Sequence, residues 1–183
     1  MMAGDKAFDL GIIVGRFQVL HKGHGYMIRK AQAVCSELAI FVGSSQESGT
    51  LKNPLSYEMR AKILKEAFPG ITVYPLPDIG VGNTYSWGEY VLENVKKNCG
   101  RLPDLTISGY ESRRTSWLEE KWNIAQLIVP KIIDISATKM IQYIIDGDQQ
   151  TWNRFIEPAI ISMYGQIREV VLQSRDELET MSI

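Results

Sequence analysis

The chain has 183 residues, of which 45% are hydrophobic and 22% charged, enough for one well-packed domain and too few for two large ones. Its 20 Lys and Arg residues against 21 Asp and Glu residues give a net charge of -1. This balance argues against the broad basic surface that nonspecific nucleic-acid binding requires. We therefore expect no nucleic-acid partner, and any anionic ligand must be held by a local site.

The location of the protein is predicted from its apolar runs and cysteines. All apolar runs are far shorter than the roughly 18 residues that a membrane-spanning helix needs. The N-terminus carries charged residues before its first apolar run and lacks a signal-peptide core. Cys35 and Cys99 form no CxxC pair, so they indicate neither a disulfide framework nor a structural zinc site. We expect a cytoplasmic protein that does not interact with membranes.

Short apolar segments rich in β-branched residues alternate with segments whose apolar residues recur every three or four positions. The first kind predicts buried strands at residues 10–14, 38–42, 71–74, 105–108 and 125–129. The second kind predicts helices at 26–35, 57–68 and 87–98, and a weaker helical stretch at 117–121. This alternation is typical of βαβ units. We therefore expect an α/β fold, a Rossmann-like parallel sheet with helices on both faces.

The rest of the chain is predicted to be helical, over residues 140–145, 152–156 and 159–172. Gly147 marks a break between the first two of these helices, and the polar tail at 174–183 is expected to fray. No internal repeat or linker separates domains. We expect one domain over 1–183, with an α/β core at about 8–145 and C-terminal helices at about 146–175.

The segment after the first predicted strand has the composition of a phosphate-binding turn. It reads GRFQVLHKGH and leads into an amphipathic helix whose start we place at Gly23. Ligands of open parallel sheets bind at the carboxyl ends of strands, where this turn lies. Gly15 allows close approach of a ligand, Arg16 can grip a phosphate, and the helix start offers unpaired N–H groups. His21 and His24, the only histidines of the chain, can point toward the same oxygens.

Other interpretations of this turn fit less well. His21 and His24 could serve only as helix caps or core residues, but two histidines beside Arg16 in one glycine-bracketed turn favour ligand binding. Zinc would need further ligands that no nearby Cys, His or carboxylate supplies. The chain contains neither GxxxxGK[ST] nor GxGxxG, which excludes a P-loop and argues against a hydride-transferring Rossmann enzyme.

This turn resembles the signature GRFQPxHxGH of the HxGH nucleotidylyltransferases, except that Val19 stands where the family often has Pro. The resemblance implies direct attack of a phosphate on the α-phosphorus of a nucleoside triphosphate, release of pyrophosphate and no covalent enzyme intermediate. Such a task needs positioned donors rather than a nucleophile. The resemblance assigns catalysis to Arg16, His21 and His24, and ATP or phosphate binding to Gly15, Phe17, Gln18 and Gly23.

Two further segments resemble the archaeal-type nicotinamide mononucleotide (NMN) adenylyltransferases. GSSQESGTLKNPLSYEMR is similar to that family's GSAQxSxTLxNPFTxxER, which assigns NMN or NAD binding to Gln46 and Asn53. The plainer interpretation is a polar loop followed by a helix capped by Ser56. YPLPDIGVGNTYSW is similar to IPLPDIxxNxxW, with a slightly longer loop. The resemblance implies that Trp87 stacks on the nicotinamide ring as a cation–π contact and that Asn83 binds its carboxamide, although Trp87 could instead be a core residue.

A third segment, IDISATKMIQYIIDG, resembles the family motif ISATxIR. Ser136 and Thr138 fall at a predicted helix start, where they either hold the triphosphate or only cap the helix. The arginine that closes the family motif falls on Ile141. The chain therefore lacks a cation that the resemblance places against the triphosphate.

Three nearby residues carry a positive charge that could replace this cation. Lys139 lies about 200° from Ile141 around the helix and so does not share its face. Arg113 and Arg114, in the loop after the fourth predicted strand, are the better candidates, and could equally be solvated surface residues.

Together these features predict an enzyme that transfers AMP from ATP to NMN, giving NAD and pyrophosphate. The alternatives are the same transfer with nicotinate mononucleotide or pantetheine phosphate as acceptor, and a nucleotide-binding sensor without turnover, which the change at Ile141 favours. We expect Mg²⁺ to accompany ATP and assign no metal ligand to a protein side chain. A homo-oligomer is consistent with the resemblance, but no apolar stripe can be assigned to an interface.

Overall fold

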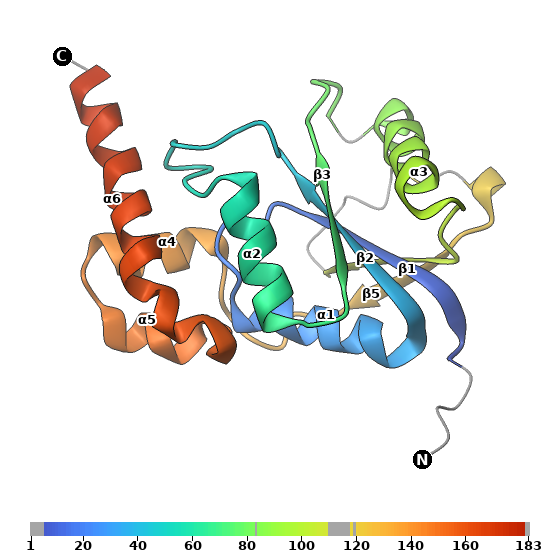
Figure 1. Cartoon of the computed structure of the whole chain (residues 1–183), viewed down its shortest axis with the longest axis horizontal. Coiled ribbons are helices and arrows are strands. Elements are labelled where there is room, and N and C mark those ends of the chain that lie inside the picture. The colour runs from blue at the N-terminus through green and yellow to red at the C-terminus, as the bar shows by residue number, and fades with distance from the viewer. Residues whose placement is uncertain (1–5, 83, 110–117, 119, 182–183) are drawn as a thin grey trace.

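A computed structural model describes residues 6–82, 84–109, 118 and 120–181, and within them a parallel sheet forms the centre (Figure 1). The strands lie in the order β3-β2-β1-β4-β5. Their bounds are β1 (Phe8–Gly15), β2 (Cys35–Gly43), β3 (Thr72–Leu76), β4 (Leu105–Gly109) and β5 (Ala125–Val129). All pairings are parallel. The predicted Rossmann-like sheet is confirmed, and each predicted strand is present.

Helices follow the strands in the predicted alternation and then form a C-terminal group. They are α1 (Lys22–Val34), α2 (Tyr57–Ala67), α3 (Tyr85–Cys99), α4 (Ala137–Ile145), α5 (Gln149–Phe155) and α6 (Tyr164–Met181), with 3-10 helices η2 (Glu120–Trp122) and η3 (Pro158–Met163). In the described part of the chain, no helix has the length and apolar character needed to cross a membrane.

One predicted helical stretch differs in the structure. The weak helical stretch at 117–121 is a 3-10 helix over Glu120–Trp122 in its described part, and residues 117 and 119 lie outside the described residues. The polar tail belongs to α6, which runs to Met181 and has Ile167, Val171 and Ser174 on one buried stripe. The fraying of this tail stays a prediction.

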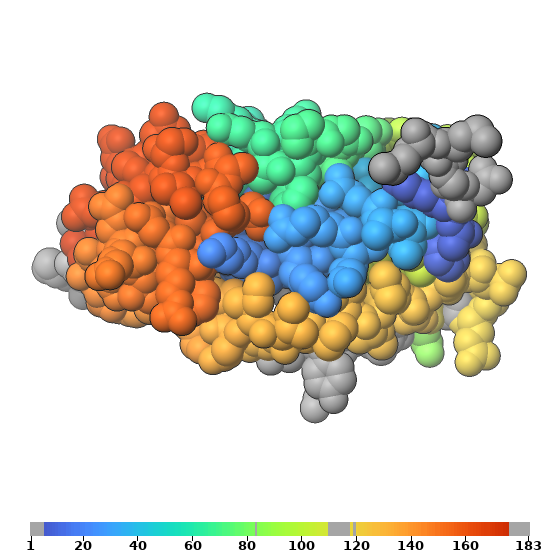
Figure 2. All heavy atoms as spheres, turned by 90° about the horizontal axis from the view of Figure 1, so that it is seen from below, coloured from blue at the N-terminus to red at the C-terminus, as the bar shows by residue number. Residues whose placement is uncertain are grey.

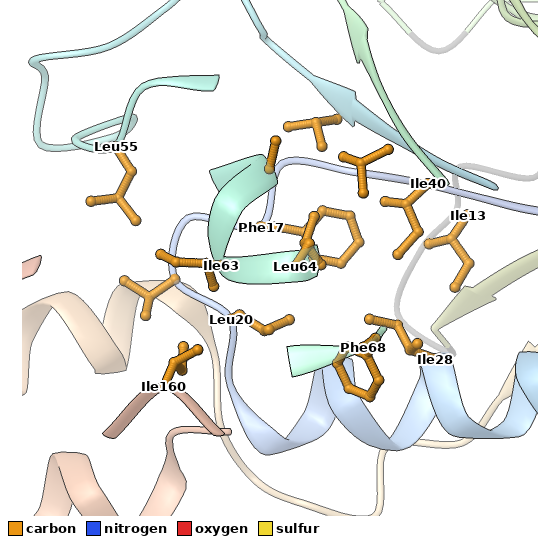
Figure 3. Packing of buried hydrophobic residues seen from close by; sticks show 14 of the residues in the cluster. Ile13, Phe17, Leu20, Ile28, Ile40, Leu55, Ile63, Leu64, Phe68 and Ile160 are labelled. Carbon is orange, nitrogen blue, oxygen red and sulfur yellow. The ribbon is translucent and has the colours of Figure 1, made fainter. Parts of the chain in front are cut away.

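Helices cover both faces of the sheet, as predicted, because successive residues of a strand point to opposite sides. Ile13 of β1 belongs to a cluster with Ile28 of α1 and Leu64 of α2 (Figure 3). Its neighbour Ile12 packs instead in a second cluster with Val91 of α3. The α1–α2 layer and the α3 layer therefore enclose the sheet.

The C-terminal helices lie beside α1 and α2 at one end of the molecule (Figure 2). The backbone forms an antiparallel bridge between His21 and Ile156, and the N–H of Glu157 donates to the carbonyl of Leu20 at 3.3 Å. Arg29 Nη1 pairs with the Glu157 carboxylate at 2.7 Å. These contacts hold the start of α1, and with it His21, against the C-terminal segment.

Gly25 of α1 lies directly under the Glu157 carboxylate, and a Cβ there would clash with Glu157 Oε2. The Glu157 side chain is 7% exposed and held by Arg29, so it has little room to move. We expect Gly25→Ala to lower the free energy of unfolding by about 1–3 kcal/mol in urea denaturation. The matched change Gly165→Ala in α6, where an added Cβ meets nothing within 4 Å, should be neutral or stabilising by up to ~1 kcal/mol. Equal effects of the two variants would contradict this packing.

Candidate functional site

The carboxyl ends of β1, β2, β4 and β5 open into a cavity of about 1190 Å³. The order of the strands reverses between β1 and β4, which is the place where open α/β sheets bind ligands. The walls come from the turn after β1, the loop after β2, residues 78–82, the start of α3, and the β5–α4 connection with α4. This volume exceeds the roughly 300–1,000 Å³ of usual small-molecule sites, so it suits a large or two-part ligand.

His21 and His24 lie face to face at the start of α1 and both line the cavity. The rings stack with centroids 3.8 Å apart, and the His24 backbone N–H donates to His21 Nδ1 at 3.3 Å. His21 is thus the N-cap, and α1 begins at Lys22, one residue before the predicted start at Gly23. A Cβ on Gly23 would come within 3.0 Å of His21 Nδ1. His21 therefore both caps α1 and lines the cavity.

Burial makes His21 a neutral side chain. It is 7% exposed, and desolvation, with a smaller contribution from the positive charge of Lys131, lowers the pKa of His21 to about 4. Because Nδ1 accepts the helix N–H, the neutral ring carries its proton on Nε2. His21 therefore offers an uncharged N–H donor near neutral pH.

We expect acid to destabilise the protein through His21. The pKa of His21 is about 4 in the folded chain against an ordinary value of 6.5. The neutral His21 ring therefore makes its full contribution to the free energy of unfolding above pH 6.5, and this contribution is lost as the pH falls toward 4. The loss corresponds to about 3 kcal/mol. His21→Asn retains a capping side chain but does not titrate. In urea denaturation, the free energy of unfolding of the unmodified protein should fall more steeply than that of the variant over this interval; parallel curves would contradict the assignment.

The other residues of the turn after β1 build its shape. Arg16 lines the cavity, and its Nη1 donates to Asn53 Oδ1 at 3.5 Å. The buried Gln18 amide donates to the Leu55 carbonyl at 3.0 Å and accepts from the Leu55 N–H at 2.9 Å, which ties this turn to the loop after β2. Phe17 has a φ of 52° and turns its ring into the core (Figure 3), 4.9 Å from His24. Gly15, Phe17 and Gln18 also line the cavity.

Arg60 of α2 is a positioning residue that was not among the predicted site residues. It is fully buried, and burial lowers its pKa. Its guanidinium donates to carbonyl oxygens at 2.9 to 3.5 Å, those of Arg16, Gly43, Ser44, Glu47 and Ser56. One side chain thereby joins the loops after β1 and β2. The available signal was the motif GSAQxSxTLxNPFTxxER, whose closing arginine falls on Arg60.

Gln46 and Asn53 were predicted to bind NMN, but the described residues that line the cavity include neither of them. Gln46 Oε1 accepts from the Asp78 backbone N–H at 3.0 Å. Asn53 is 1% exposed, and its amide donates to the Glu47 carboxylate. Asp78, in contrast, does line the cavity, and its carboxylate accepts from the Ser44 hydroxyl at 2.5 Å. Both amides bond to loop residues in the described structure, and their contact with NMN stays a prediction.

The wall near α3 is apolar. Trp87 lines the cavity from the first turn of α3, where its backbone N–H donates to the capping Thr84 hydroxyl at 3.4 Å. Ile79 and Val81 line the same cavity and remain 43% and 39% exposed. Asn83, predicted to accompany Trp87, lies outside the described residues. The wall therefore offers an indole and two aliphatic side chains to a planar ligand.

The opposite wall is the start of α4. Ser136 caps this helix by accepting the Lys139 backbone N–H at 3.3 Å, and both Ser136 and Thr138 line the cavity. Ile141 also lines it, although it is 8% exposed and part of the core. The Lys139 ammonium pairs with Asp134 at 2.7 Å and is absent from the described cavity lining. Lys139 thus does not supply charge to this wall.

The remaining cations of the site come from three segments. Arg113 and Arg114, the preferred replacements for the motif arginine, lie outside the described residues. Among the described residues that line the cavity, those with permanent positive charge are Arg16, Lys52 and Lys131. Lys131 follows the carboxyl end of β5. Ligands of open parallel sheets bind at the carboxyl ends of strands, so the sequence indicates Lys131 for the same reason that it indicates Arg16 after β1.

Comparison with known proteins agrees with this arrangement. A family model described as cytidylyltransferase-like matches residues 12–150. The nicotinamide-nucleotide adenylyltransferase of Pyrococcus abyssi is 39% identical over 166 residues, which cover 87% of this chain and 84% of that protein.

Solved structures share the fold. A bifunctional NMN adenylyltransferase/ADP ribose pyrophosphatase from Francisella tularensis superimposes with a TM-score of 0.73 at 19% identity, and this chain covers 55% of its length. The structure of such an enzyme from the same organism complexed with AMP and a manganese ion gives a TM-score of 0.66 at 22% identity, over 54% of that chain. This chain spans about half the length of these two proteins, and the matched part covers 94% of this chain. From the family match and the archaeal relative together, the chain belongs to the cytidylyltransferase-like family and, within it, to the nicotinamide-nucleotide adenylyltransferases.

Proposed function

We propose that this chain transfers AMP from ATP to NMN, giving NAD and pyrophosphate. The observation that carries the proposal is that one cavity joins two kinds of wall. Arg16, His21 and His24 lie at the end formed by the turn after β1 and the start of α1, and Trp87 lies on its apolar wall. A ligand that bears both phosphates and a planar cationic ring matches both walls.

The residues at the start of α1 would stabilise charge on phosphate oxygens. A phosphate oxygen of NMN attacks the α-phosphorus of ATP, and a new P–O bond forms. The bond from the α-phosphorus to the bridging oxygen breaks, and pyrophosphate leaves with the bonding electrons. Arg16 donates as a charged fork, His21 as a neutral N–H and His24 from the adjacent ring. The transfer needs no nucleophile from the protein.

We propose that Mg²⁺ reaches this site with ATP. Within the described residues, no three His, Cys, Asp or Glu side chains converge as a metal site. The ion would therefore be held by phosphate oxygens, and it would neutralise part of the triphosphate charge. The use of a divalent ion is supported by the Francisella tularensis structure with AMP and manganese.

The apolar wall would bind the nicotinamide. Trp87 offers an indole face to the cationic ring, a contact worth about 1–2 kcal/mol when desolvated. The Asp78 carboxylate in the same cavity complements a cationic ring and would repel the carboxylate that nicotinate mononucleotide has in place of the carboxamide. Asn83 stays a predicted carboxamide ligand. The predicted homo-oligomer and the cytoplasmic location also stay predictions.

The test is direct product analysis. Purified protein is incubated with ATP, NMN and Mg²⁺, and NAD and pyrophosphate are quantified. We expect equal amounts of both, and less product with nicotinate mononucleotide or pantetheine phosphate. Absence of NAD at millimolar substrates would overturn the proposal, and tight NAD binding in calorimetry without turnover would identify a sensor instead.

A further inference from the structure

Lys131 supplies positive charge to the cavity wall that the β5–α4 connection and α4 form. Arg16 and Lys52 reach the cavity from the loops after β1 and β2, whereas Lys131 comes from the β5–α4 connection. Ser136, Thr138 and Ile141 line the cavity from this same part of the chain. Among the described cavity-lining residues of this wall, Lys131 is therefore the cation.

Lys131 and Lys139 share one ion-pair partner. Lys131 Nζ lies 3.2 Å from Asp134 Oδ1, and Lys139 Nζ lies 2.7 Å from Asp134 Oδ2. The Asp134 side chain is 79% exposed, so solvent weakens both ion pairs. If Lys131 turned toward a phosphate, Lys139 would still neutralise Asp134.

Lys131 also lies close enough to the histidine pair to influence it. Its positive charge contributes to the lowered pKa of His21, and both residues line one cavity. The Lys131 side chain is 34% exposed, so it is partly shielded from solvent, and a charge-assisted bond there is stronger than one in bulk water. A phosphate chain bound between the start of α1 and the start of α4 would lie in the cavity that Lys131 lines.

We infer that Lys131 binds the triphosphate of ATP and supplies the positive charge of the wall on which Ile141 presents an apolar side chain. The inference rests on the proposed function for the identity of the ligand. It adds a binding residue that neither the motif at 136–141 nor Lys139 provides. The ammonium acts as a flexible point charge and so does not need the geometry of an arginine at position 141.

The test compares Lys131→Met with Lys139→Met. Both variants remove one ammonium from Asp134, but only Lys131 lines the cavity. We expect Lys131→Met to weaken binding of a non-hydrolysable ATP analogue in calorimetry by about 10- to 100-fold, and Lys139→Met to change it by less than about threefold. Unchanged affinity in Lys131→Met, or an equal loss in both variants, would overturn the inference.

Two further variants separate charge from packing. Lys131→Arg should keep ATP-analogue affinity within a few-fold, and Ile141→Arg in the Lys131→Met background should recover part of it. Failure of both to exceed the affinity of Lys131→Met would overturn the role of charge. Because these measurements omit NMN, they are independent of NAD formation. A protein that binds ATP through Lys131 but makes no NAD would refute the proposed function and leave this inference intact.

Discussion

Replacing His24 with alanine is expected to lower kcat/KM for NAD formation by about 10²–10³-fold. The ring lines the cavity and stacks on His21. Its Nδ1 is buried, which leaves Nε2 as the nitrogen that can reach a phosphate. The free energy of unfolding should fall by no more than ~1–2 kcal/mol, because His24 is only half-buried. Kinetics and urea denaturation of the same preparations measure the two effects.

The matched controls are His24→Gln and His24→Asn. The amide nitrogen of Gln reaches the position of Nε2, whereas that of Asn reaches only the position of Nδ1. We therefore expect His24→Gln to retain more activity than His24→Asn. A loss of activity that follows the loss of stability in all three variants would instead show that His24 only supports the packing of α1.

Replacing Arg60 with methionine is expected to lower the free energy of unfolding by about 3–5 kcal/mol. The side chain is fully buried, and its loss leaves the carbonyls of Gly43 and Ser44 without the donors they have at 2.9 and 3.0 Å. The same change frees the turn that carries Arg16, whose carbonyl accepts from Arg60 at 3.0 Å. Urea denaturation gives the stability, and the KM values for ATP and NMN should both rise.

Two variants keep this prediction testable if Arg60→Met folds poorly. Arg60→Lys keeps the charge, but an ammonium has three donors and cannot span the carbonyls of both loops, so an intermediate loss is expected. Lys62→Met removes an exposed charge from the same helix and should change stability by less than about 0.5 kcal/mol. A loss in Lys62→Met as large as that in Arg60→Met would refute the role of the buried guanidinium.

The strands and most helices were predictable because each depends on local spacing. The β-branched run at Ile12 and Ile13 has the pattern of a strand buried on both faces, and the structure places these two residues in opposite core clusters. The weak stretch at 117–121 failed because so short a periodic pattern does not distinguish an α-helix from a 3-10 turn. The polar composition of the C-terminal tail did not indicate that α6 runs to Met181.

The candidate site was predictable where several residues stand in one short turn. Arg16, His21 and His24 are close in sequence and follow a strand, so they reach the cavity together. Gln46 and Asn53 were harder to judge because amides bind backbone and ligand equally well. Only the folded loops show that their bonds go to the Asp78 N–H and the Glu47 carboxylate.

The sequence by itself determined the order of strands and helices and the composition of the turn after β1, because hydrophobic periodicity and turn chemistry act over a few residues. The tertiary structure decided which charges are buried, paired or turned toward the cavity. Arg60 and Lys62 stand two positions apart, yet one joins two loops and the other is exposed. Lys131 and Lys139 share Asp134, yet only Lys131 lines the cavity. The energy of a charged side chain depends on its desolvation and on partners distant in sequence. The spacing of residues along the chain determines neither of these.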